Sequence, residues 1–315
     1  MAIQTPQALI SLEQVDKKFV LSTETVHALK SVSFSIPKES FSIIYGPSGS
    51  GKSTLLNTMV GLEPPTAGRV VIEGQDLYSL NSDQRANFRA RTLGMVYQTN
   101  YWVNSLTVLE NVCMPLFLAG YSKRQAISVA LDSLTMVGMA DFTKKRPTVL
   151  SGGQQQRVSM ARAIVANPEL IVADEPTGNL DTKNGDMIMN LLSDLNHKLH
   201  KTIILVTHNL EYLSLSTHRV QIKDGTVVED AGIYGLTPKQ KKERIKRLQE
   251  SFTQKGGPAK SNMTIAEMQN QLAGGDADEV DSNESGSKIS KVNEEKLQSK
   301  KGLVDGVSKK KGHKS

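Results

Sequence analysis

The stretch FSIIYGPSGSGKSTLLNTMV, from Phe41 to Val60, joins three local patterns without a gap. A mostly apolar run comes first, then a loop rich in glycine and serine, then apolar residues at helical spacing. The first run is typical of a strand buried on both faces, and the last of a helix with one buried side. The segment therefore predicts a strand–loop–helix unit of an α/β fold.

The loop of this unit has the pattern of a phosphate-binding loop, with its glycines, a lysine and a serine at the required positions. Glycines let backbone N–H groups turn towards phosphate oxygens, and the following helix N-terminus adds a partial positive charge. Lys52 would neutralise the β- and γ-phosphates, and the Ser53 hydroxyl would ligate Mg²⁺. A plain Gly/Ser-rich surface turn is the alternative, and the flanking strand and helix disfavour it. The predicted phosphate-binding residues are Gly46, Pro47, Ser48, Gly49, Ser50, Gly51, Lys52, Ser53 and Thr54.

A second apolar run, LIVADE from Leu170 to Glu175, ends in two acidic residues. Asp174 would hold Mg²⁺ through water, and Glu175 would polarise the attacking water as a general base. On its own the pair could be two solvated acids that end a strand. Together with a phosphate-binding loop it predicts a nucleotide-hydrolysing protein, of a class still open between GTPases, helicases and other P-loop machines.

Further segments complete the predicted α/β fold. Buried strands are expected at Phe41–Tyr45, Met95–Tyr97, Leu170–Ala173 and Ile203–Val206, and Gly46, Gln98, Asp174 and His208 follow their carboxyl ends. Alternating segments predict an antiparallel β layer beside this sheet: Ile10–Val15, Val32–Ile36, Arg69–Glu73, and a hairpin of Val220–Ile222 and Thr226–Glu229 around the turn Lys223–Gly225. Residues 105–165 are expected to be largely helical, with breaks at Pro115, Gly120, Gly138 and Pro147.

The pentapeptide LSGGQ, Leu150–Gln154, decides between the open classes. Ser151 is a good N-cap for the helix that follows, and two glycines leave its first backbone N–H groups accessible. The chain thus contains a second helix end suited to an anion. With these motifs in this order, residues 9–230 resemble the ATP-binding cassette family, whose signature is this pentapeptide. The resemblance implies a P-loop core with a mostly parallel sheet, an antiparallel β subdomain and a helical signature subdomain at about residues 100–165.

The resemblance also assigns roles to other residues. Gln98 matches the family's Q-loop, which senses Mg²⁺ and contacts the membrane subunit, and Asp181 matches the D-loop at the dimer interface. His208 matches the switch histidine that contacts the γ-phosphate, although alone it could be an ordinary polar cap. Phe19 stands where an aromatic residue stacks on adenine, or it could be a strand core residue. Catalysis is assigned to Glu175, His208, Gln98 and Lys52. Besides the phosphate-binding loop, nucleotide binding is assigned to Phe19, Ser151, Gly152, Gly153, Gln154 and Asp181, and the metal to Ser53, Gln98 and Asp174.

The family's mechanism is that two such chains close head-to-tail around two ATP molecules and drive a separate transmembrane permease. The segments LTVLENV, LSGGQQQRV and DEPTGNLD are similar to the macrolide-exporter and lipoprotein-release branch, which implies export or membrane extraction of a peptide, lipoprotein or drug-like substrate. A regulatory cassette of the cell-division (FtsE) type is the alternative. The chain departs from the branch pattern at Thr99–Asn104, which holds its single tryptophan, Trp102; an anchoring contact to the partner and core packing are both open for that residue.

Composition bounds the remaining properties. No run of 18 apolar residues and no secretory signal is visible in the sequence. The single cysteine, Cys113, lies in an apolar segment. These observations predict a cytoplasmic protein, and the resemblance implies that its permease partner holds it at the membrane. The net charge of +6 is not distributed evenly: residues 231–315 carry 17 basic and 11 acidic residues, and residues 1–230 carry 21 of each. The core is therefore not expected to bind nucleic acid.

Three regions follow from these patterns. Residues 1–232 are predicted to be the nucleotide-binding domain, residues 233–273 a basic, weakly helical extension, and residues 274–315 a disordered tail of low complexity. The extension is expected to be solvated, and the alternative is that Lys241–Arg247 lies against anionic lipid headgroups.

Overall fold

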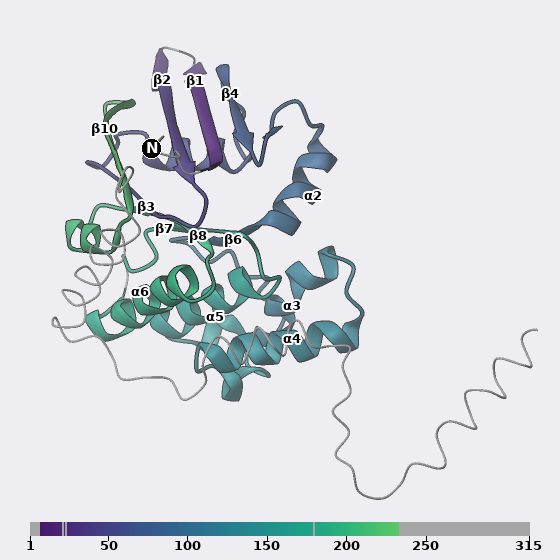
Figure 1. Ribbon diagram of the computed structural model, residues 1–315. Coiled ribbons are helices and arrows are strands. Elements are labelled where there is room, and N and C mark those ends of the chain that lie inside the picture. Colours follow the sequence, from purple (N-terminus) through teal and green to yellow (C-terminus); the bar gives the residue numbers. More distant parts are fainter. Residues whose placement is uncertain (1–6, 21, 23, 179, 233–315) are drawn as a thin grey trace, which may run out of the picture. The chain divides into compact units, whose positions relative to one another are not determined.

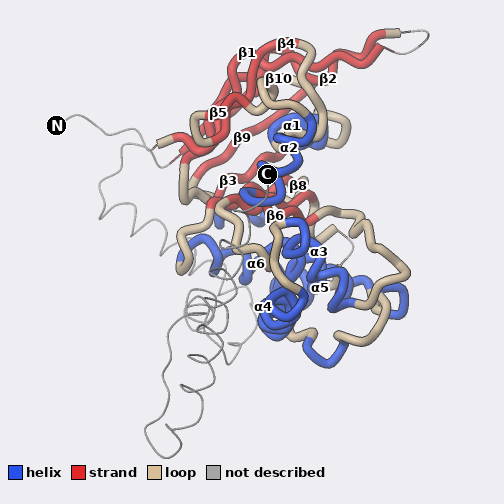
Figure 2. The backbone as a smooth tube through the Cα atoms, turned by 90° about the vertical axis from the view of Figure 1, so that its right-hand side faces the viewer, coloured by secondary structure: helices blue, strands red, loops and turns tan. Residues whose placement is uncertain are grey.

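The structure is a computed structural model that describes residues 7–20, 22, 24–178 and 180–232. Contacts divide the chain into the units Met1–Leu272 and Ala273–Ser315, and all described residues belong to the first. The predicted extension and tail, including Lys241–Arg247, lie outside the described residues. Within the first unit the two sheets and the helices lie in successive layers, which Figures 1 and 2 show from two sides.

The larger sheet positions the site. Its described strands run in the order β10-β9-β3-β8-β7-β6, and β3, β8, β7 and β6 pair in parallel as predicted. The strands are β3 (Phe41–Tyr45), β6 (Leu93–Val96), β7 (Leu170–Asp174), β8 (Thr202–Thr207), β9 (His218–Lys223) and β10 (Thr226–Gly232). Their parallel members therefore end at one edge, as ligand sites of open α/β sheets require.

The smaller sheet is antiparallel and has the order β2-β1-β4-β5. Its strands are β1 (Ala8–Val20), β2 (Thr25–Pro37), β4 (Ala67–Ile72) and β5 (Gln75–Asp76). The predicted alternating segments at residues 10–15 and 32–36 fall on β1 and β2, and the segment 69–73 falls on β4 except for its last residue, Glu73. Buried residues alternate with exposed ones along β2, because one face of this sheet packs on the interior.

The assignment of the hairpin at residues 220–229 to the antiparallel layer was wrong. β9 and β10 do pair antiparallel around Asp224 and Gly225, both with positive φ, but β9 also pairs in parallel with β3 and so extends the larger sheet. The alternation of Val220 and Ile222 showed one buried face and could not show which strand lay alongside.

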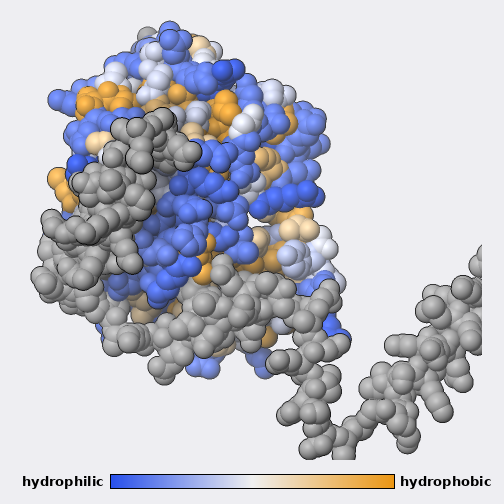
Figure 3. Space-filling model, in the orientation of Figure 1, coloured by the Kyte–Doolittle hydropathy of each residue, from blue (hydrophilic) through white to orange (hydrophobic). Residues whose placement is uncertain are grey.

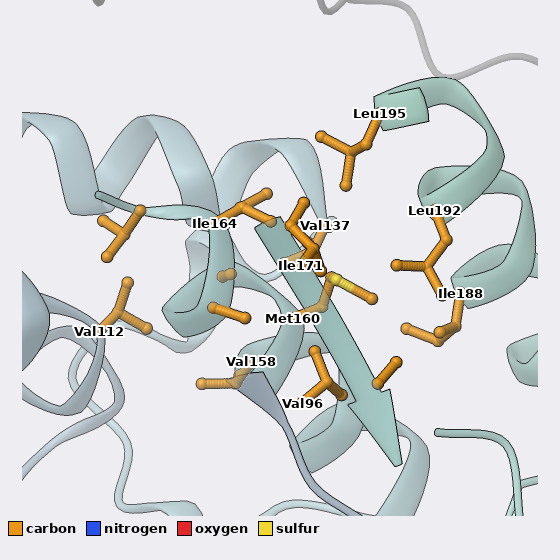
Figure 4. Close-up of a cluster of buried hydrophobic side chains, with 14 of the residues drawn as sticks. Val96, Val112, Val137, Val158, Met160, Ile164, Ile171, Ile188, Leu192 and Leu195 are labelled. Carbon is orange, nitrogen blue, oxygen red and sulfur yellow. The ribbon is translucent and has the colours of Figure 1, made fainter. Parts of the chain in front are cut away.

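The larger sheet separates two hydrophobic cores. Alternate residues of each central strand enter opposite cores, so Ile171 and Leu205 pack with the helices of one side, whereas Val172 and Val206 pack with the helix α1 (Lys52–Met59) and the antiparallel sheet. In Figure 4 the side chains of Ile171, of Met160 and of Ile188 converge in the first core. Such burial on both faces explains the continuous apolar runs in the sequence. Cys113, from the apolar segment noted in the sequence, is buried in this core.

The other helices are α2 (Ser82–Thr92), α3 (Val108–Leu118), α4 (Lys123–Met136), α5 (Gly152–Ile164) and α6 (Thr182–His197), with short 3-10 segments at Ala140–Phe142, Pro147–Val149 and Leu210–Leu215. Pro115 was wrongly predicted to break a helix: it lies inside α3, which ends near Gly120, where φ is 89°. Pro115 removes one backbone N–H donor from α3. The complete capping box of Thr107 and Glu110 stabilises the start of this short helix, which continues through the proline.

Among the described helices, none combines the length and the apolar character needed to cross a lipid bilayer. The face shown in Figure 3 is mostly hydrophilic, with smaller hydrophobic areas between.

Candidate nucleotide-binding and hydrolysis site

A cavity of about 870 Å³ lies at the carboxyl edge of the larger sheet, where the phosphate-binding loop, β7 and β8 end. It collects predicted residues from distant parts of the sequence: Phe19, Ser48, Gly49, Gly51, Lys52, Ser53, Thr54, Gln98, Asp174, Glu175 and His208. It is also lined by residues that the sequence did not single out, namely Val26, His27, Ala28, Lys30, Val206, Asp224 and Gly225. The fold therefore forms one site from most of the predicted set.

The lysine of the loop is held inside the loop itself. Lys52 Nζ donates to the carbonyl oxygens of Gly46 and Pro47, at 2.9 and 2.8 Å. The helix α1 begins at this lysine, and its N-cap Gly51 gives no side-chain hydrogen bond. The other α-helices of the described residues each begin with a side-chain cap. The uncapped N–H groups of α1 and the ammonium group together form a positive environment for phosphate.

Two glycines of the loop are required by close backbone contacts. A Cβ atom at Gly46 would lie 2.0 Å from the carbonyl oxygen of Ile222, and one at Gly51 would lie 2.6 Å from that of Ala28. Gly225 N–H donates to the Ser50 carbonyl at 3.0 Å, so the β9–β10 turn supports the loop from behind. The loop is thus a close-fitting backbone cradle, which suits the oxygens of a polyphosphate.

Asp174, Glu175 and His208 meet at the ends of β7 and β8. His208 Nδ1 lies 2.7 Å from Glu175 Oε1, and the Thr207 hydroxyl donates to Glu175 Oε2 at 3.3 Å. Burial, with the charge of Glu175, raises the pKa of Asp174, and the nearby Lys52 lowers it. The Glu175 side chain is only 14% exposed and the His208 side chain 70%. The carboxylate is therefore fixed in place while the imidazole can reach a ligand.

Glu175 also has a strained backbone, because its φ of 45° lies in the left-handed region that is unfavourable for a residue with a side chain. Its N–H donates to Val206 O at 2.9 Å and its own carbonyl accepts from Gly178 at 3.1 Å. These bonds hold the strained conformation, and such strain is common where a fold must aim a functional side chain.

The residues predicted to hold Mg²⁺ have the right chemistry for it. Ser53, Gln98 and Asp174 all line the cavity and offer hydroxyl, amide and carboxylate oxygens, the donors that this ion prefers. Among the described residues there is no group of three or more His, Cys, Asp or Glu side chains placed to hold a metal. A single carboxylate with a hydroxyl and an amide oxygen is a donor set of the kind that shares Mg²⁺ with phosphate oxygens.

The signature residues Ser151–Gln154 are not among those lining the cavity. As predicted, Ser151 caps α5: its Oγ accepts from Gln154 N–H at 3.3 Å, and the Gln154 amide oxygen accepts from Ser151 N–H at 3.0 Å. A Cβ at Gly153 would lie 2.9 Å from the Asn184 side chain. One chain thus presents two separate helix ends suited to anions, that of α1 inside the cavity and that of α5 outside it.

Asp181 caps α6 by accepting from Asn184 N–H at 2.8 Å and from the Asn184 side chain at 2.7 Å. These hydrogen bonds lower the pKa of Asp181. Asp181 also lines a second cavity, of about 600 Å³, together with Glu175 and His208. The predicted D-loop aspartate therefore caps a helix within the chain and lines the same cavity as Glu175 and His208.

The segment after Gln98 is fastened to α5. Arg162 donates to the carbonyl oxygens of Asn100 and Tyr101, at 2.5 and 3.3 Å, and its guanidinium carbon lies 4.4 Å from the centroid of the Trp102 ring. Trp102 Nε1 donates to Gln155 at 2.9 Å. Trp102 is half-buried against the core, whereas Tyr101 is 69% exposed. The tryptophan therefore packs against the hydrophobic core, and the tyrosine lies on the surface.

This architecture and this site define a P-loop nucleotide-binding protein, and comparisons with known proteins give its family. Residues 29–178 match the model of the ABC transporter family. An uncharacterised ABC transporter ATP-binding protein of Thermotoga maritima is 44% identical over 232 residues, which cover 73% of this chain and 99% of that protein.

Solved structures agree. The dimeric structure of MJ0796, a bacterial ABC transporter cassette, has a TM-score of 0.69 and 39% identity, over 72% of this chain and 100% of that one. Its post-hydrolysis dimer bound to ADP and Pi has a TM-score of 0.69, 38% identity and the same coverage. The cbiO1 protein of Clostridium perfringens, 24% identical with a TM-score of 0.63 over 79% of this chain and 92% of that one, shares the fold.

The chain belongs to the ABC transporter family as an ATP-binding protein, and it is an ABC-type ATPase.

Proposed function

We propose that this chain is the motor subunit of an ABC complex for export or membrane extraction, in which two copies enclose two ATP molecules and a separate permease spans the membrane. The position of the signature residues carries this proposal. Ser151 and Gly153 are outside the cavity that contains Lys52, Asp174 and Glu175. A γ-phosphate bound at Lys52 would meet a signature helix only if a second chain supplied it.

Within such a pair each side chain has a role set by its surroundings. Lys52 and the N–H groups of α1 offset the phosphate charge. Glu175 accepts a proton from the attacking water, because His208 and Thr207 hold its carboxylate in one orientation. His208 is mostly exposed and close to Glu175, so it is placed to contact the γ-phosphate side of the substrate. Ser53, Asp174 and Gln98 would hold Mg²⁺, which supplies charge neutralisation at the phosphates.

The first test is the substitution Glu175→Gln. It should lower ATP turnover by about 10²-fold or more, because the proton acceptor is lost, while ATP binding persists. ATP should then trap a stable dimer, measured by light scattering after size exclusion, and Lys52→Ala should prevent it. A Glu175→Gln protein that stays monomeric in saturating ATP would show that Glu175 is not the base or that ATP does not drive closure.

A second test asks whether one site is built from two chains. Lys52→Ala and Ser151→Arg should each abolish ATPase activity when purified alone. Mixing them should restore part of it, since a mixed dimer has one site with an intact lysine from one chain and an intact signature from the other. No recovery, in a mixture shown to form mixed dimers, would contradict a shared site.

The assignment to the macrolide-exporter and lipoprotein-release branch rests on the sequence segments 106–112, 150–158 and 174–181. The proposed contact with the permease rests on the exposed Tyr101, three residues after Gln98. We propose that Tyr101 contacts the permease on the cytoplasmic side of the membrane. Co-purification of the membrane subunit tests this, because Tyr101→Ala should weaken the complex and leave the basal ATPase activity unchanged. Substrate-binding features in the extracytoplasmic part of that subunit would indicate a transporter, and their absence would indicate a regulatory cassette.

A further inference from the structure

Lys17, on β1, is a buried lysine that the hydrolytic chemistry does not use. Its side chain is 9% exposed, and its ammonium group donates to Glu63 Oε1 at 2.5 Å and to the carbonyl oxygen of Pro64 at 2.7 Å. The same nitrogen lies 4.9 Å from the centroid of the Phe19 ring. Burying a charged group is costly unless it has partners. The partners of Lys17 therefore indicate that its charge has a structural role at this position.

The lysine lies outside the cavity that the aromatic ring lines. Residues two apart on a strand point to the same face, which places Lys17 and Phe19 side by side on β1. Phe19 lines the cavity, whereas Lys17 does not and is buried. The ammonium group thus lies over the ring without lining the cavity, so Lys17 does not take the space that a ligand would fill.

Lys17 also connects this ring to the helix that follows the phosphate-binding loop. Its partners Glu63 and Pro64 come just after the end of α1, and the Glu63 backbone N–H donates to Asn57 O of that helix at 3.2 Å. The hydroxyl of Tyr78 donates to the carbonyls of Thr58 and Glu63, at 2.8 and 2.6 Å. One network thus fixes the spacing between Phe19 and the phosphate end of the site.

We propose that Lys17 is a positioning residue for the nucleotide base. It holds the Phe19 ring at a set distance from the phosphate-binding loop. Its positive charge on the rear face draws electron density from the ring, which strengthens stacking of the front face on an electron-rich purine. This inference rests on the predicted role of Phe19 as the residue that stacks on adenine in the proposed ATP site, and it adds the residue that orients the Phe19 ring.

The test compares a ligand that has a base with one that lacks it. Binding of ATP and of inorganic tripolyphosphate, both with Mg²⁺, is measured by titration calorimetry for the full chain. Lys17→Met should weaken ATP binding about 3- to 10-fold, because the ring loses its fixed position and its polarisation, and leave tripolyphosphate binding unchanged. Lys17→Arg should restore most of the loss. Lys18→Met, a neighbouring exposed lysine on β1, is the matched control and should change neither ligand.

A combined variant separates positioning from general support of the fold. In a Phe19→Ala background, Lys17→Met should cause no further loss of ATP affinity, because the ring through which it acts is gone. Equal weakening of ATP and tripolyphosphate, or the same loss with and without the ring, would overturn the proposal. If Lys17→Met fails to fold, Lys17→Gln carries the same comparison.

The variant Phe19→Ala alone distinguishes the two levels of the proposal. If it leaves the ratio of ATP to tripolyphosphate affinity unchanged, Phe19 does not stack on the base and the role of Lys17 falls with it. If it lowers that ratio while Lys17→Met does not, Phe19 keeps its role and only the inference about Lys17 is wrong.

Discussion

Asp174 and Glu175 are neighbours in the sequence, yet the fold gives their carboxylates different surroundings. Glu175 accepts from Thr207 and lies 2.7 Å from His208, which holds its orientation. The pKa of Asp174 is raised by its burial at the end of β7 and by the charge of Glu175. Its negative charge is therefore a cost to the folded chain that the predicted metal would offset.

Asp174→Asn should therefore stabilise the metal-free protein and abolish its activity. A carboxyl group whose pKa is raised on folding destabilises the native state as pH rises above its ordinary pKa, so the asparagine gains most at neutral pH. Each kcal/mol gained should raise the melting temperature by about 2–4 °C, and the difference from wild type should shrink as acid protonates the native carboxyl. Melting curves in a chelator from pH 4.5 to 7.5 check this. Asp141→Asn, at an exposed position, should show no such gain.

At the scale of elements, local patterns predicted the strand–loop–helix unit well. The strand at Phe41–Tyr45 and the cap at Ser151 are confirmed, because each depends on residues within one short segment. The hairpin of β9 and β10 was predicted as a hairpin but placed in the wrong sheet, since its partner β3 is far away in the sequence. The pairing of Arg162 with the backbone of Asn100 could not be predicted either, as nothing in the α5 sequence indicates which loop its basic side chain meets.

Two of the three glycines of the phosphate-binding loop, Gly49 and Gly46, should differ in the cost of an added methyl group. Gly49 has φ of 77° and no atom within 4 Å of the place that a Cβ would take, so Gly49→Ala should cost about 1–2 kcal/mol from backbone conformation alone. Gly46→Ala should cost more, because its methyl would enter the carbonyl of Ile222 and displace β9. Denaturant unfolding of the two variants without nucleotide measures the difference. Equal losses would mean that the loop and β9 are not in close contact.

The contact of Arg162 with Trp102 makes the single tryptophan a natural reporter of the segment after Gln98. Arg162→Met should remove two hydrogen bonds to backbone carbonyls and the cation over the indole. We expect the tryptophan emission to shift to longer wavelength as the ring becomes more exposed, and the free energy of unfolding to fall by about 1–3 kcal/mol. Arg124→Met, at an exposed position on α4, should leave the emission unchanged. An unaltered spectrum in Arg162→Met would contradict the contact.

On the scale of the whole chain, net charge differs between the nucleotide-binding core and the residues that follow it. The core residues 1–230 are balanced, and the excess of basic residues lies in 231–315, outside the described residues apart from the last two of β10. The shape of the site could be predicted because its residues follow the ends of parallel strands. The contribution of a second chain could not be predicted from spacing within one chain; it came from the family resemblance and is proposed from the position of Ser151.

If Lys241–Arg247 binds anionic lipid, a chain ending at Gly232 should lose that binding. This end point keeps β10 complete, including the contact of Asp230 with His218 at 2.7 Å. Each cation near a charged surface contributes about 1 kcal/mol, so binding to vesicles with phosphatidylserine should fall strongly and also weaken in high salt. Vesicle flotation of both chains measures it, with neutral vesicles as the control. Equal flotation of the long and short chains would remove the lipid hypothesis.

The helix α1 begins without a side-chain cap, unlike the other described α-helices, and this has a consequence for the lifetime of the protein. No side-chain cap accepts from its first N–H groups, so bound phosphate oxygens would supply acceptors for them and stabilise the start of the helix. At a nucleotide concentration about 100 times the dissociation constant, binding to the native state alone adds about 2.7 kcal/mol against unfolding. The cellular supply of ATP would then govern how long the chain resists proteases, apart from any work that it performs.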